Sequence, residues 1–243
     1  MADGVRDIST KGLIEIMSHE GVCLSPYLDS VGVWTIGVGI TKYDGKDPKT
    51  MGDITIDQAI QMFKDRIGAY VAPVQALPVA RSGLLTQAQF DALVSFCYNV
   101  GPGNLANLCR NRNVAQIGEA FSLYHKPPEI TERRDKEQRL FKSGIYSSNG
   151  KVLVFPVSAS HKPIYSKGYT LDVSKYFAAA DPSRPQDAAP PVTPGPEPGI
   201  APPKPGTEPG IAPPKPGTAA PSQPPSAWAA FFMAIAKLFG GKK

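Results

Sequence analysis

The sequence predicts an α+β protein, with one small antiparallel sheet near the N-terminus followed by helices. Extended, glycine-punctuated chain runs from Leu24 to about Asp47, which is typical of short strands joined by turns. Downstream segments have the hydrophobic period of helices. Of the 26 prolines, 17 fall in residues 181–225, so we expect the folded part to end near residue 180.

Two of the expected helices begin with the same signal. In TIDQAIQMFKDRIGAYV, Thr55 precedes Gln58 by three positions, which is a capping box. Thr86 and Gln89 repeat it in LTQAQFDALVSFCYNVG, a helix expected to end at Gly101. The other expected elements are helices over Ser9–His19, Val114–Tyr124 and Thr131–Lys142, and a short strand region in KVLVFPVSAS and KGYTLDVSKYF.

Composition limits the function classes. The chain has 243 residues, 42% of them hydrophobic, which is enough for one sizeable core or two small ones. The net charge of +5 is only a mild excess, whereas a nucleic-acid-binding protein usually shows a dense stripe of basic residues. No nucleic acid is therefore expected as a partner. Cys23, Cys97 and Cys109 match neither a disulfide framework nor a metal-ligand spacing, so we expect buried thiols, no metal and no cofactor.

The N-terminal segment MADGVRDISTKGLIEIM lacks the long apolar run of a signal peptide. We therefore expect a protein made in the cytoplasm, which reaches any target outside it only after release. We also expect a monomer.

The C-terminal third divides into two segments. Within residues 181–225 the motif EPGIAPPKPGT occurs twice, at Glu197–Thr207 and Glu208–Thr218, and this composition predicts an extended linker that spans on the order of 100 Å. Residues 226–243 predict a short amphipathic helix, with aromatic side chains along one face of Trp228–Phe239. It is too short to cross a bilayer but could lie in a membrane interface; docking on the folded domain is the alternative.

The stretch HEGVCLSPYLDSVGVWTIGVG carries two acids and a threonine among apolar residues. Glu20 follows an apolar helix, so burial should raise its pKa and keep it protonated. Asp29 precedes a turn, where we expect it to be solvated and ionised. Two carboxyl groups in different surroundings suit glycoside hydrolysis, and the Thr35 hydroxyl could hold the attacking water. By themselves these residues also fit a loop and hairpin with solvated acids.

The same stretch closely resembles the EG…L…Y.D..G..TIG.G signature of phage-type lysozymes, the endolysins of glycoside hydrolase family 24. LTQAQFDALVSFCYNVG is similar to the central helix of that family, and ERRDKEQRLF to its RR..E..L(F/W) helix. The three motifs occur in the family's order and bracket about residues 9–142. The resemblance implies a lysozyme-like fold over residues 1–180, in which a small N-terminal antiparallel sheet and a mainly helical lobe enclose a cleft.

The resemblance also implies catalytic roles. Glu20 would be the general acid, Asp29 the carboxylate that orients or activates the attacking water, and Thr35 the hydroxyl that helps to hold it. An inverting reaction is expected, which requires carboxyl groups about 6.5–9.5 Å apart.

Three further residues are expected around the substrate. Tyr98 would line the cleft and Asn99 would contact sugar amide groups. One of Arg133 and Arg134 would approach and place Glu20, and the motif favours Arg133. The alternative for this arginine pair is a solvated helix face.

The implied substrate is bacterial peptidoglycan, cleaved at the β-1,4 bond between N-acetylmuramic acid and N-acetylglucosamine, with lysis of the host cell. A lytic transglycosylase would act on the same bond and leave a 1,6-anhydro sugar. A wall- or membrane-disrupting protein that works mainly through its C-terminal helix is the alternative from a different class. The sequence leaves open whether residues 144–180 complete the core or form an addition.

Overall fold

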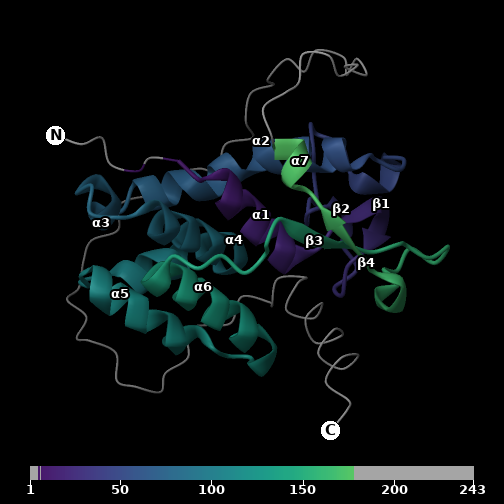
Figure 1. Cartoon of the computed structure of the whole chain (residues 1–243). Coiled ribbons are helices and arrows are strands. Elements are labelled where there is room, and N and C mark those ends of the chain that lie inside the picture. The colour runs from purple at the N-terminus through teal and green to yellow at the C-terminus, as the bar shows by residue number, and fades with distance from the viewer. Residues whose placement is uncertain (1–4, 6, 178–243) are drawn as a thin grey trace, which may run out of the picture. The chain divides into compact units, whose positions relative to one another are not determined.

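A computed structural model describes residue 5 and residues 7–177 of the chain (Figure 1). The predicted linker and C-terminal helix, residues 181–243, lie outside the described residues. No helix within the described part is long and apolar enough to cross a membrane. The order of elements is α1 (Thr10–Glu20), β1 (Cys23–Leu28), β2 (Trp34–Gly37), α2 (Ile56–Gln75), α3 (Pro78–Arg81), α4 (Gln87–Cys109), α5 (Val114–Ala120), α6 (Thr131–Ser143), β3 (Lys151–Val154), β4 (Tyr169–Asp172) and α7 (Ser174–Phe177).

Both predicted capping boxes are present. The Thr55 hydroxyl accepts from the Gln58 N–H and the Gln58 side chain accepts from the Thr55 N–H, so α2 begins one residue later. Thr86 and Gln89 make the same reciprocal pair before α4. Each box satisfies N–H groups that the first helical turn leaves without partners, and so fixes where the helix begins.

The predicted end of the central helix at Gly101 corresponds to a break within α4. Gly101 has φ 82° and ψ 166°, a conformation outside the helical region, and Pro102 follows it. Helical chain then resumes and runs to Cys109. Tyr98 and Asn99 lie in the last turn before this break.

The predicted α+β class is confirmed, and within the described residues the strands form two small sheets. Strands β1 and β2 form an antiparallel pair near the N-terminus, and β3 pairs antiparallel with β4. A parallel bridge between Val22 and Val154 connects the chain before β1 to the end of β3. The strand character of both late segments was visible in the sequence. Their pairing was not, because it joins segments that are distant along the chain.

Helix α4 lies in the middle of the core and packs against α1, α2 and α6 (Figure 1). Its Phe90, Leu93 and Phe96 are fully buried. Side chains of the last described segment, Val152 and Val173 among them, belong to the same core. Each such side chain contributes roughly 1.5–3 kcal/mol by burial. Residues 144–177 therefore complete this core and do not form a separate addition.

Candidate active site

Glu20 is the last residue of α1, at the point where the helix passes into β1. The next residue, Gly21, has φ 71°, and its N–H donates to Met17 O. A glycine adopts this left-handed conformation without strain, so the chain can leave the helix sharply there. The turn places the Glu20 side chain in the interior, where only 1% of it is exposed.

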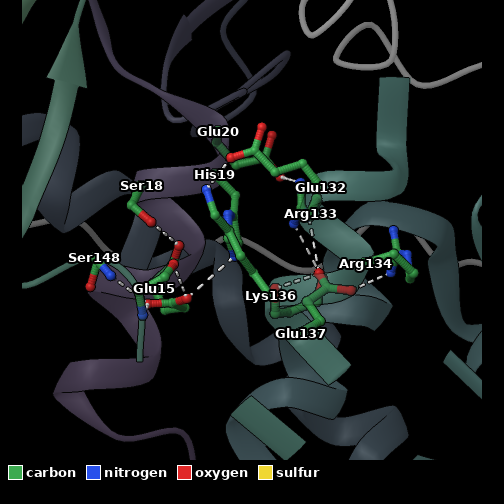
Figure 2. A network of polar contacts seen from close by, with 12 residues as sticks. Glu15, Ser18, His19, Glu20, Glu132, Arg133, Arg134, Lys136, Glu137 and Ser148 are labelled. Atoms are coloured by element: carbon green, nitrogen blue, oxygen red, sulfur yellow. Dashed lines mark hydrogen bonds and ion pairs between the residues drawn. The ribbon is translucent and has the colours of Figure 1, made fainter. Parts of the chain in front are cut away.

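Arg133, from α6, contacts Glu20 across the interior. Its Nη1 lies 2.5 Å from Glu20 Oε1, and its Nε lies 3.0 Å from Oε1 of Glu137. Arg134 donates to the other oxygen of Glu137, so one carboxylate holds both neighbouring arginines (Figure 2). Arg133, which the motif favours, is thus the arginine that contacts Glu20.

The alternative of a solvated arginine pair is wrong. Arg133 is 2% exposed and Arg134 0%. Although α6 carries many charged side chains, it turns these two arginines inward, because Glu137 lies on the same face, four and three residues further along the helix. A buried guanidinium is retained only when carboxylates and hydrogen bonds replace its lost hydration.

The pKa of Glu20 is raised, as predicted. Burial is the main cause, and the negative charge of Glu137 adds to it, while the Arg133 guanidinium pulls in the opposite direction. Oε1 accepts from Arg133, whereas Oε2 has no hydrogen-bond partner among the described residues. A proton on Glu20 is therefore best accommodated on Oε2, which gives this side chain the form of a general acid.

Asp29 is buried, contrary to the expectation that it is solvated. It follows β1 directly and is 7% exposed. Its Oδ1 accepts from the N–H groups of Val31, at 2.9 Å, and Val33, at 2.8 Å. The tight turn after β1 thus supplies backbone donors where we expected water.

Thr35 lies in β2, opposite Tyr27 of β1, and is 1% exposed. Its hydroxyl donates to Val33 O at 3.1 Å. The Asp29 N–H donates to the same carbonyl at 3.0 Å. Asp29 and Thr35 are therefore held by one short hairpin and share a backbone partner.

Tyr98 and Asn99 are half-buried and both make contacts within the protein. The Tyr98 hydroxyl donates to Val38 O at 2.7 Å, and its ring packs against Tyr70. The Asn99 Oδ1 accepts from Arg134 Nη2 at 2.5 Å. Because the carbonyl of Asn99 is engaged in this way, its NH2 group is the part that remains for a ligand. The predicted sugar contacts of both residues stay predictions.

The remaining buried titratable groups are three cysteine thiols and a histidine. The thiols of Cys23, Cys97 and Cys109 are buried, and burial raises the pKa of each to about 12, so they are not reactive thiolates. His19, beside Glu20, has a pKa well below its ordinary value because of burial and the nearby Arg133. Within the described chain, no group of three His, Cys, Asp or Glu side chains could hold a metal ion.

Sequence reasoning missed Glu137 and Ser95. The Ser95 hydroxyl donates to Glu137 Oε1 at 2.7 Å, and the Ser95 carbonyl accepts from Arg133. The spacing of Glu137 after the arginine pair was a usable signal, since residues three and four apart share a helix face. The sequence contains no such signal for Ser95, because only the packing of α4 against α6 brings Ser95 next to Glu137.

Comparison with known proteins places these features in a family. The family model described as phage lysozyme matches residues 17–137. The chain is 32% identical to an endolysin of Salmonella phage P22 over 146 residues, which cover 98% of that protein and 56% of this chain. It is 36% identical to an endolysin of Bacillus phage PZA over 150 residues, 56% of this chain, but the match spans only 55% of that relative.

A solved structure shows a similar fold. An endolysin from Escherichia coli O157:H7 phage FAHEc1 superimposes with a TM-score of 0.53 at 30% identity. The match covers 59% of this chain and 98% of the other. The likeness therefore includes nearly the whole of that protein and leaves a large part of this chain outside it.

Proposed function

The chain belongs to the phage lysozyme family and is a glycosidase of the lysozyme type, and we propose that it is an endolysin that hydrolyses the β-1,4 bond between N-acetylmuramic acid and N-acetylglucosamine in peptidoglycan. The observation that supports this most directly is the buried Glu20, whose pKa is raised and whose Oε2 lacks a partner within the described chain. As in related phage endolysins, the target would be the bacterial cell wall, reached after release.

In the proposed reaction, Glu20 donates the proton from Oε2 to the glycosidic oxygen as the bond to the anomeric carbon breaks. Arg133 holds Oε1 and so fixes the direction of Oε2. After donation, the same guanidinium stabilises the carboxylate that remains. A carboxyl group that is neutral before proton donation and forms an ion pair with arginine afterwards is suited to act as a general acid.

Asp29 acts on the water side of the bond. Val31 and Val33 both donate to Oδ1, which leaves Oδ2 for a water molecule. Because the Thr35 hydroxyl gives its proton to Val33 O, its oxygen remains an acceptor for that water. Asp29 takes a proton from the water molecule while the water oxygen attacks the anomeric carbon. The product is a new reducing end with inverted configuration.

Access to these groups requires movement. Glu20 and Thr35 are each 1% exposed, so a glycan strand cannot reach either side chain in this conformation. We propose that glycan binding exposes both side chains by displacing other parts of the surrounding chain, while α1 and the β1–β2 hairpin keep their positions relative to each other. Closure over the substrate would then exclude water other than the attacking molecule.

The decisive experiment digests purified peptidoglycan and analyses the products by mass. The wild type should release fragments with ordinary reducing ends, and Glu20→Gln should reduce the rate at least a hundredfold. Glu119→Gln, a change in an exposed ion pair with Lys142, serves as the control and should digest at the wild-type rate. Digestion by Glu20→Gln at the wild-type rate would remove Glu20 as the acid.

The same products separate hydrolysis from transglycosylation. Anhydro-muramic ends would show that the chain is a lytic transglycosylase. NMR of the anomeric protons during the first turnovers would give the stereochemistry, and retention of configuration would contradict the proposed direct attack by water.

Membrane contact through Trp228–Phe239 is a separate proposal that rests on the sequence alone. The aromatic face and the terminal lysines favour an interface with anionic lipid. Co-sedimentation with anionic liposomes should be stronger for the full chain than for a chain truncated after Pro225. Equal binding by both would contradict the proposal.

A further inference from the structure

A segment of the described chain beyond the family-matched region is bound to the helix that carries Glu20. The match ends at residue 137, and the chain then reaches α1 at Glu15. The Glu15 carboxylate, which is fully buried, accepts from the N–H groups of Ser147, at 2.9 Å, and Ser148, at 3.0 Å. The Ser147 hydroxyl adds a third bond, at 2.6 Å. Figure 2 shows Glu15 and Glu20 on the same helix, with Ser148 against Glu15.

The same segment then runs beside the strand that leads to Asp29. The Val22 N–H donates to Leu153 O at 2.9 Å, and the Phe155 N–H donates to Val22 O at 2.8 Å. Phe155 packs on Cys23 and Tyr27 of β1. Strand β1 is thus paired with β2 on one side and contacted by the later segment at its beginning.

A second contact lies at the other end of β1, made by the tip of a hairpin. The chain folds back so that the Ile164 N–H donates to Pro156 O at 2.7 Å and the Ser158 N–H to Lys162 O at 2.8 Å. His161, at the tip, has φ 57°, in the left-handed region that asparagine, aspartate and histidine adopt more often than other residues apart from glycine.

In this conformation His161 contacts the β1–β2 hairpin, which carries Asp29 and Thr35. Its carbonyl accepts from the Leu28 N–H at 2.8 Å, one residue before Asp29. Its ring meets the Trp34 ring edge-on, with centroids 4.8 Å apart, one residue before Thr35. Leu28 and Trp34 face each other across β1 and β2, so His161 spans the end of the strand pair from which both catalytic side chains emerge.

We infer that His161 is a positioning residue for the lysozyme reaction: through the contacts of its carbonyl with Leu28 and of its ring with Trp34, the 156–164 hairpin fixes Asp29 and Thr35 relative to Glu20. The inference rests on the proposed function for the roles of these three residues. The segment as a whole holds both sides of the site, because Glu15 fastens it to the Glu20 helix and His161 fastens it to the Asp29 strand.

The expected benefit is geometric. Strands β1 and β2 form a sheet of two strands, and a two-stranded pair is marginally stable without support from other parts of the fold. Misplacement of a reacting group by about 1 Å can reduce a rate about a hundredfold. A contact that limits motion at the end of this pair therefore affects turnover even though it lies outside the reacting atoms.

Three variants of His161 separate the backbone from the ring. His161→Pro forbids the left-handed φ and removes the N–H that donates to Ser158 O, so the carbonyl should leave Leu28. His161→Asn tolerates the left-handed conformation and keeps the carbonyl in place, and His161→Gly does so without any side chain. Because His161 is exposed, none of the three disturbs the buried core.

Kinetics on purified soluble glycan strands give the first measurement. His161→Pro should lower kcat at least tenfold with a change of less than threefold in KM, and its melting temperature should stay near that of the wild type. His161→Asn, which keeps the carbonyl contact but lacks the ring, should regain part of the lost kcat. Wild-type kcat in His161→Pro, or loss of kcat only in proportion to the unfolded fraction, would overturn the inference.

Hydrogen exchange gives a measurement that does not depend on activity. The amide of Leu28 should exchange at least tenfold faster in His161→Pro than in the wild type, and at nearly the wild-type rate in His161→Gly and His161→Asn. Unchanged protection of Leu28 in His161→Pro would show that the hairpin does not hold the strand. If the wild type does not cleave peptidoglycan while this exchange pattern appears, the proposed function fails and the contact itself stands.

Discussion

Arg133 and Glu20 come from helices more than a hundred residues apart in sequence and meet in the interior, with 2.5 Å between Nη1 and Oε1. Both side chains are almost completely buried. The cluster around them contains two arginines and two glutamates, so its net charge is zero when both acids are ionised and +1 when Glu20 carries a proton. Burial is the main cause of the raised pKa of Glu20, the three neighbouring charges modify it, and Glu137 is the residue that links the two arginines.

Glu137→Gln should be one of the most destabilising single polar changes in this domain. It leaves two buried guanidiniums with Glu20 as their remaining carboxylate, and removal of one partner from a buried ion pair costs about 3–5 kcal/mol. Chemical denaturation should show this loss in the free energy of unfolding. As a control, Glu119→Gln breaks an ion pair whose side chains are exposed, and should cost about 0–1 kcal/mol.

The same Glu137→Gln variant should change the pH dependence of activity. Because the negative charge of Glu137 helps to raise the pKa of Glu20, its removal should lower that pKa. The alkaline limb of the pH–rate profile, where Glu20 loses its proton, should move to lower pH. An unmoved limb in a folded variant would contradict the role given to Glu137.

Glu20→Gln should become more stable relative to the wild type as pH rises. Burial raises the pKa of Glu20 above its ordinary value of 4.5, so the folded state retains a proton that the unfolded chain has released. Wild-type stability therefore falls with increasing pH from about 4.5 up to the folded pKa, by at most about 1.4 kcal/mol per pH unit. Thermal unfolding of both proteins across this range measures the difference, and parallel curves would contradict the raised pKa.

His19→Gln should show the opposite trend, at acidic pH. Burial holds the pKa of His19 well below its ordinary value of 6.5, so the unfolded chain takes up a proton that the folded state excludes. Wild-type stability should fall as pH decreases below about 6.5, and His19→Gln should lack that part of the loss. Melting temperatures at a series of pH values test this, with the two curves expected to run parallel above pH 8.

Gly12→Ala should destabilise the domain through Asp91. A Cβ at Gly12 would lie 2.5 Å from Asp91 Cγ, and Asp91 is the fully buried acceptor for Ser9 and Tyr146. Displacement of a buried group by overpacking costs about 1–3 kcal/mol. Gly68→Ala is the matched control: it is exposed in α2 with open space around it, and should stabilise by about 0.5–1 kcal/mol. Equal effects of the two changes on unfolding would contradict the proposed contact.

Several parts of this protein could be predicted from sequence because their signals are local. Thr55 and Thr86 cap their helices as predicted, since a capping box joins residues three positions apart. The burial of Glu20 followed from the apolar face of α1. The burial of Asp29 was not predictable in this way. The groups that replace water around it are the backbone N–H groups of Val31 and Val33, and backbone donors leave no signal in the side-chain sequence.

By itself the sequence predicted the main helices, the order of the three motifs and the candidate catalytic residues, because periodicity, caps and motif spacing are properties of neighbouring residues. The tertiary structure decided the partners. That Glu15 holds Ser147 and Ser148 and that His161 contacts Leu28 and Trp34 both depend on packing between distant segments. Such contacts form only when the buried core brings those segments together, and no local pattern encodes them.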